Sequence, residues 1–99
     1  MKIEVKESRD ERTFILYQEL ISSNINQLES EMNKYMKENS KDIIIDLINV
    51  TKIDSISIAT LIRIKNRLTE EGRNLKLRNP NESVMRVLEL AGLQEFLLE

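Results

Sequence analysis

The sequence has 99 residues, of which 40% are hydrophobic and 32% are charged, a balance typical of an ordinary globular protein rather than a disordered or membrane protein. It contains no cysteine and no histidine. This excludes a disulfide framework, a thiolate metal site and a cysteine nucleophile, and it removes the commonest general base. The 15 basic and 17 acidic residues are interspersed and give a net charge of −2, so we expect no nucleic-acid partner.

The length predicts one domain, residues 1–99, with a modest core. No apolar run approaches the span of a bilayer, and residues 1–10 lack the order of a signal peptide. We therefore expect a cytoplasmic protein without membrane insertion. The missing residue types, and the absence of a glycine-rich phosphate loop, favour a protein that is not an enzyme and has no metal and no cofactor.

The chain begins with the pattern of a β-hairpin. Within residues 1–10 the apolar Ile3 and Val5 alternate with charged residues, as in an edge strand with one face toward water. A polar turn follows, and Thr13 to Tyr17 is rich in β-forming residue types. These two strands are expected to pair antiparallel.

A first amphipathic helix is predicted from Ile25 to about Glu38, because apolar residues recur there at helical spacing. Asn24 precedes it and Gln27 stands three residues later. This spacing predicts a capping box, in which the two side chains satisfy backbone N–H groups of the first turn.

The segment from Asp42 to Leu68 is expected to organise the fold. Its run Ile43 to Leu47 suits a central strand that is buried on both faces. Apolar residues then recur on one side of a second helix, whose start is predicted at Asp54 and Ser55.

The remaining third of the sequence predicts another strand and another helix. Gly72 is expected to end the second helix, and Leu75 to Arg78 to form a strand parallel to the central one. Asn79 is the predicted N-cap of a third helix, which Gly92 closes. The apolar residues after Gly92 predict a turn and a short last strand.

The junction between the central strand and the second helix is the predicted functional position. Ligand and modification sites in open α/β sheets lie beyond the carboxyl ends of strands, next to the positive end of a helix. The hydroxyl of Ser55 would lie there and could accept a phosphate. A purely structural explanation is also open, since Asp54 or Ser55 could simply cap the helix. Ser57 and Thr60 are alternative acceptors, but they are more simply polar residues of the first helical turns.

Two segments of the sequence, and the separation between them, resemble the STAS domain of bacterial anti-sigma factor antagonists. The first is KDIIIDLINVTKIDSISIATLIRIKNRL, in which the matching positions are Asp46, Leu47, Val50, Ile53, Asp54, Ser55 and Ile58. The second is NESVMRVLELAGLQEFL, which matches at Val84, Val87, Leu88, Gly92, Leu93 and Phe96. The resemblance extends over essentially the whole chain.

The resemblance implies a single STAS-like α/β domain, with a four- to five-stranded mixed sheet and about three helices packed against it. It implies partner switching: the unphosphorylated protein binds an anti-sigma factor that is a serine kinase, the kinase phosphorylates Ser55 and so releases the complex, and a serine phosphatase reverses the reaction. The partner-binding residues carried over are Glu19, Asp54, Ser55, Ile56 and Ser57.

The sequence departs from the family pattern around these residues. Ile56 replaces a serine or threonine, and Ser57 replaces a glycine that would permit close approach of a partner. Of the family's Gly-Glu-Leu-Asp only Glu19 and Leu20 are kept, and the family's final helix is expected to lie outside the 99 residues. A phosphorylation-independent STAS subunit of a transporter or of a larger signalling complex is therefore the alternative function.

Overall fold

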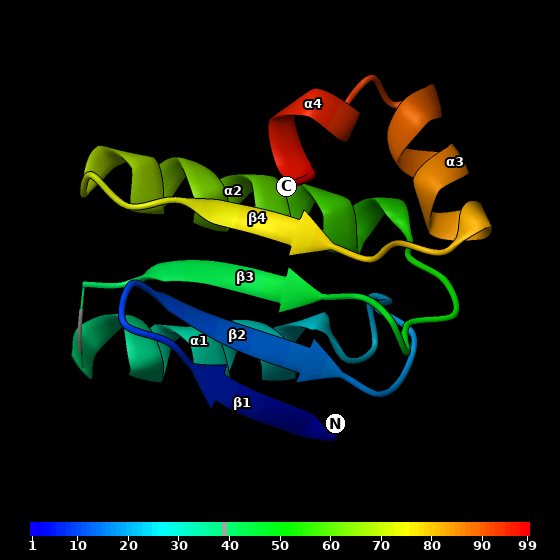
Figure 1. Ribbon diagram of the computed structural model, residues 1–99. Helices are drawn as coiled ribbons and strands as arrows, with labels where there is room; N and C mark the ends of the chain where they lie inside the picture. Colours follow the sequence, from blue (N-terminus) through cyan, green and yellow to red (C-terminus); the bar gives the residue numbers. More distant parts are fainter. Residues whose placement is uncertain (39) are drawn as a thin grey trace.

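The computed structural model describes residues 1–38 and 40–99. Four strands form one mixed sheet in the order β1-β2-β3-β4, and β1 pairs antiparallel with β2, whereas β2, β3 and β4 are parallel (Figure 1). The strands are β1 (Ile3–Glu7), β2 (Glu11–Leu16), β3 (Asp42–Asp46) and β4 (Leu75–Arg78). The predicted fold class, the hairpin and the parallel pairing of β3 with β4 are confirmed.

The helices are α1 (Ile25–Glu38), α2 (Ser55–Glu70), α3 (Glu82–Leu90) and α4 (Gln94–Leu97). Figure 1 shows α1 and α2 behind one face of the sheet, and α3 and α4 beyond β4. Within the described residues, no helix is long and apolar enough to cross a bilayer.

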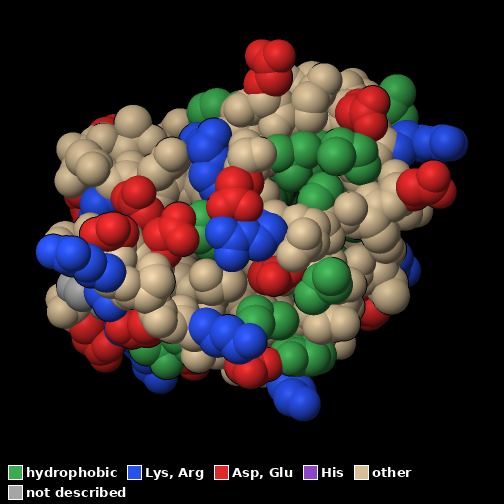
Figure 2. All heavy atoms as spheres, in the orientation of Figure 1, with side chains coloured by type: hydrophobic (Ala, Val, Ile, Leu, Met, Phe, Trp, Pro, Cys, Tyr) green, Lys and Arg blue, Asp and Glu red, His purple; other side chains and the backbone are tan. Residues whose placement is uncertain are grey.

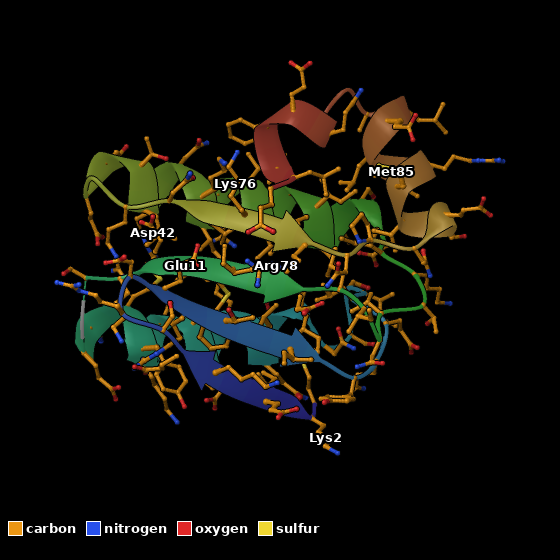
Figure 3. The ribbon with its side chains drawn as sticks, viewed as in Figure 1. Lys2, Glu11, Asp42, Lys76, Arg78 and Met85 are labelled. Carbon is orange, nitrogen blue, oxygen red and sulfur yellow. The ribbon has the colours of Figure 1, made fainter. Side chains whose placement is uncertain are left out.

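The core lies between the sheet and the two long helices. On β3, Ile43 and Ile45 belong to this core, while Ile44 points to the opposite face and is still only 2% exposed. The predicted burial of this strand on both faces is thus confirmed. The opposite face of the sheet carries charged side chains, among them the labelled residues of Figure 3, Glu11, Asp42, Lys76 and Arg78.

Both glycines end helices as predicted. Gly72 follows α2 with φ +74°, and Gly92 follows α3 with φ +70°. These are left-handed conformations that glycine adopts without steric cost.

The predicted capping box of α1 is wrong. The Asn24 side chain is buried and turns back, so that its oxygen accepts the N–H of Ile21 (3.1 Å) and its amide donates to the carbonyl of Glu19 (2.7 Å). Gln27 instead accepts a hydrogen bond from the amino group of Met1 (2.7 Å). The side chain of Asn24 therefore stabilises the turn before α1, and not the first turn of the helix as its spacing had predicted.

The predicted start of α3 is also wrong, because Asn81 and not Asn79 is the N-cap. The Asn81 oxygen accepts the N–H of Val84 (2.8 Å). Asn79 has φ +58°, and its amide donates to Asp46 (3.2 Å) at the end of β3. The chain therefore turns at Asn79 before the helix begins.

The predicted last strand is reduced to one bridge. Residues 94–97 form the short helix α4, because the N–H groups of Leu97 and Leu98 donate to the carbonyls of Leu93 and Gln94 (2.9 Å each). After α4, Leu98 forms a single parallel bridge to Leu77, and the N–H of Glu99 donates to the carbonyl of Leu77 (3.0 Å).

Candidate functional site

Three loops meet where the parallel strands end. They are residues 17–24 after β2, residues 47–54 after β3 and residues 79–81 after β4. The carboxyl ends of parallel strands lie at the same edge of a sheet, so their loops are brought together there. All the residues predicted for partner binding lie on the first two loops or on the first turn of α2.

The first two loops are joined by backbone pairing. Leu20 forms a parallel bridge with Ile53, in which the Leu20 N–H donates to the carbonyl of Lys52 (3.0 Å) and its carbonyl accepts the N–H of Asp54 (3.1 Å). The side chains of Leu20 and Ile53 are buried in the core. The loops therefore form a small continuation of the sheet that fixes the start of α2.

Asp54 holds both this bridge and the helix. One carboxylate oxygen accepts the N–H of Ser57 (2.8 Å) as the N-cap of α2, and the other accepts the N–H of Ser22 (2.8 Å) from the loop before α1. The N–H of Ser57 is the main cause that lowers the pKa of Asp54 below its ordinary value, and the N–H of Ser22 adds to it. The capping explanation considered from the sequence is therefore correct for Asp54.

Ser55 is not needed as a cap. It is the first residue of α2 and is exposed, as is Ile56, whose apolar side chain keeps 56% of its surface in contact with solvent. Since Asp54 takes the capping role, the hydroxyl of Ser55 is left facing water at the positive end of a 16-residue helix.

Ser57 and Thr60 are placed differently. Ser57 has 0% exposed surface, and Thr60 is buried and donates its hydroxyl to the carbonyl of Ile56 (3.0 Å). The prediction that Ser57 contacts a partner is corrected, because its side chain points into the protein. Because the hydroxyls of Ser57 and Thr60 are both buried, neither is accessible as a phosphate acceptor.

Glu19 lies on the first loop and is half-buried. Its carbonyl is held by the amide of Asn24, so the loop has a defined shape one residue before the Leu20–Ile53 bridge. The bridge brings the loop of Glu19 next to the segment that carries Asp54 and Ser55.

Two residues of this region escaped the sequence analysis. Asn81 donates its amide to the carbonyls of Val50 and Thr51 (3.2 Å each), which ties the third loop to the second. Ile48 is 61% exposed on the second loop. No role was assigned to it from the sequence, and in the structure its N–H donates to the carboxylate of Asp46 (3.0 Å) in the turn after β3.

The face of the molecule that Figure 2 shows carries side chains of both charges. Figure 2 shows acidic and basic side chains interspersed, with several apolar side chains exposed between them. Among the residues that the structure describes, no three or more acidic side chains converge as a metal site would need.

Comparison with known proteins agrees with this architecture. The family model of the STAS domain matches residues 2–98. A structure from Thermotoga maritima, provisionally described as an anti-sigma factor antagonist, is 26% identical, with a TM-score of 0.87 over 97% of this chain and 83% of its own. The structure of the anti-sigma factor antagonist SpoIIAA in its unphosphorylated form is 17% identical, with a TM-score of 0.82 over 98% of this chain and 86% of its own. No curated protein sequence matches the chain. On the match over residues 2–98, the chain belongs to the STAS domain family.

Proposed function

We propose that this protein is an anti-sigma factor antagonist that works by partner switching. In its unmodified form it binds an anti-sigma factor through a docking surface that we define as Glu19, Asp54, Ser55 and Ile56. The similarity to the Thermotoga maritima structure supports this role. So does the position of these residues on two loops that backbone pairing joins.

The exposed hydroxyl of Ser55 is the observation that carries the proposal. A phosphate there adds a charge of about −1.5 to −2 at the end of a helix whose dipole tolerates it. No described residue uses the Ser55 side chain as a hydrogen-bond partner, and Asp54 already holds the helix start. Phosphorylation is therefore expected to change the surface and to leave the fold intact.

The same charge would weaken binding. The unmodified surface presents a small hydroxyl next to the exposed Ile56, which suits an apolar contact with the partner. A phosphate beside Ile56 must lose its water when the partner docks, and the nearby carboxylate of Asp54 adds like charge. An anti-sigma factor that is itself a serine kinase could thus release the antagonist by modifying Ser55, and a serine phosphatase would restore binding.

The switch can be tested with two substitutions at one residue. Ser55→Ala should bind the anti-sigma factor as tightly as the unmodified protein, whereas Ser55→Asp should lose at least tenfold in affinity by calorimetric titration, about 1.4 kcal/mol. Ser83→Asp is the matched control, because Ser83 is also an exposed serine in the first turn of a helix. Equal affinities for Ser55→Ala and Ser55→Asp would contradict the proposal.

Ile56 favours the alternative function, a STAS subunit that binds its partner without phosphorylation. More than half of this apolar side chain is exposed where the family has a hydroxyl residue, so apolar contact alone could hold a partner. Incubation with ATP and candidate serine kinases, followed by peptide mass mapping, separates the two functions. Phosphate on Ser55 supports switching, and no phosphate with retained partner binding supports the alternative.

A further inference from the structure

The two edge strands of the sheet, β1 and β4, differ in whether another segment of the chain pairs with them. At β4, the N–H of Glu99 donates to the carbonyl of Leu77 (3.0 Å), and Leu98 bridges to the same residue. At β1, no segment among residues 1–38 and 40–99 pairs with the outer side of the strand. An uncovered edge offers a row of backbone groups to another strand.

The hairpin register shows which groups are free. The N–H of Ser8 donates to the carbonyl of Glu11 (2.9 Å), and antiparallel pairs alternate from there between bonded and non-bonded. Glu4 and Lys6 consequently direct their backbone groups toward β2. Ile3, Val5 and Glu7 direct theirs outward, so three successive outward N–H and C=O sets are available along β1.

The charges of β1 are complementary to themselves. Glu4 and Lys6 both point to the solvated face. When a second β1 is placed antiparallel with Val5 opposite Val5, Glu4 of each copy lies directly opposite Lys6 of the other. The outward groups of Ile3 then meet those of Glu7, so the backbone pairing extends over the whole strand. A shift by two residues to a centre at Glu4 would place glutamate opposite glutamate.

There is room for this pairing beside α1. Tyr35 of α1 contacts Phe14 of β2 with ring centroids 5.3 Å apart, so α1 lies over β2. In a paired sheet the two copies of α1 would be three strand spacings apart, about 14 Å, whereas packed helices need roughly 8–10 Å. The gap coincides with a hollow of about 600 Å³ next to β1, lined by Met1 and Ile3 and by the first turns of α1.

We infer that two copies of this chain associate through β1, in an antiparallel two-fold pairing centred on Val5, to form one continuous eight-stranded sheet. The two-fold axis is perpendicular to the sheet, so both copies keep their long helices on the same side. It reverses the strand direction, so the docking surfaces of the two copies face opposite ways and both remain open. Such a dimer could hold two partners at once.

Charge substitutions test the pairing and its register. By light scattering over a range of concentrations, the unmodified chain should reach the mass of two chains. Glu4→Lys and Lys6→Glu should each weaken association by about tenfold, since symmetry changes two cross-strand pairs at once. Mixing the two variants should restore it, because each then places unlike charges opposite the other. Lys2→Glu is the matched control and should not alter association, because Lys2 lies opposite Ser8 in this register.

Amide hydrogen exchange supplies a second readout that needs no substitution. The amides of Glu4 and Lys6 should be protected at every concentration, whereas those of Ile3, Val5 and Glu7 should become protected only as the dimer forms. The mass of one chain at all concentrations would overturn the inference. So would a dimer in which the mixed variants fail to associate, or in which Lys2→Glu alone weakens the pairing.

Discussion

Asp54 stabilises the proposed docking surface with a single carboxylate. Its two oxygens accept N–H groups from α2 and from the loop before α1, so the residue that prepares the start of the helix also fixes the neighbouring loop. Ser55 next to it has neither duty. Asp54 therefore stabilises the start of the helix, and a change of charge at Ser55 would leave that stabilisation in place.

At the scale of the residue, Asp54→Ala should reduce the free energy of unfolding at pH 7 by about 1–2 kcal/mol, because an N-cap is lost together with the hydrogen bond from Ser22. Ser55→Ala should change it by less than about 0.5 kcal/mol, as expected of an exposed side chain. Urea unfolding of the three proteins measures both. Equal losses in the two variants would show that Ser55 shares the capping.

The pH dependence of the Asp54 contribution has a definite sign. Its folded pKa is lowered from the ordinary 3.8, so its stabilising effect is fully present above that value and is lost as the pH falls through the lowered pKa. The difference in stability between the unmodified protein and Asp54→Asn should therefore shrink toward acidic pH. A difference that grows on acidification would contradict this assignment.

The helices α2 and α3 end in the same way. After α2, Gly72 donates to the carbonyl of Thr69 (3.0 Å) and the next N–H reaches Leu68 (2.9 Å), and Gly92 repeats these two bonds after α3 with Glu89 and Leu88. A Cβ at either glycine would meet no atom within 4 Å apart from those of its own chain neighbours. Any cost of substitution there comes from the backbone conformation alone.

At the scale of the element, Gly72→Ala and Gly92→Ala should therefore destabilise the protein by similar amounts, about 1–2 kcal/mol each, the cost of a left-handed conformation for a residue with a Cβ. Gly72→Asn should cost less than Gly72→Ala, since asparagine tolerates this conformation. Thermal and urea unfolding measure the differences. A much larger loss at one glycine would reveal a contact that the present geometry does not contain.

Several carboxylates across the molecule have a lowered pKa. Hydrogen bonds from cationic side chains are the main cause for three of them: Lys41 acts on Glu7, Arg63 on Glu29 and Arg78 on Glu99. These pairs connect β1 to the segment before β3, α1 to α2, and β4 to residue 99. Ionised carboxylates thus link elements that are distant in the sequence.

At the scale of the whole molecule, the contribution of these three pairs to the free energy of unfolding should be fully present above the ordinary glutamate value of 4.5 and should decrease as the pH falls through the lowered folded values. Urea unfolding at a series of pH values measures this. Added salt should reduce the effect, since most of these pairs are exposed and screened. A stability that rises below pH 4.5 would contradict the charge arrangement.

Much of this architecture could be predicted from the sequence, because the signals are local and periodic. Alternation in β1, the continuous apolar run of β3, the one-sided stripes of α1 and α2, and the positions of Gly72 and Gly92 each report on neighbouring residues only. The family motif likewise placed Asp54 and Ser55 at the start of α2. The α/β fold and the mixed sheet followed from these patterns.

Only the tertiary structure decided the placement of polar side chains that have more than one possible hydrogen-bond partner. Asn24 turns back to the preceding loop, Asn81 takes the cap expected of Asn79, and Ser57 is buried although Ser55 and Ile56 before it are exposed. Each choice depends on backbone groups that long-range contacts bring near, such as the Leu20–Ile53 bridge. Spacing along the chain carries the period of a helix or strand, but it carries no record of which distant N–H or carbonyl will lie within hydrogen-bonding reach.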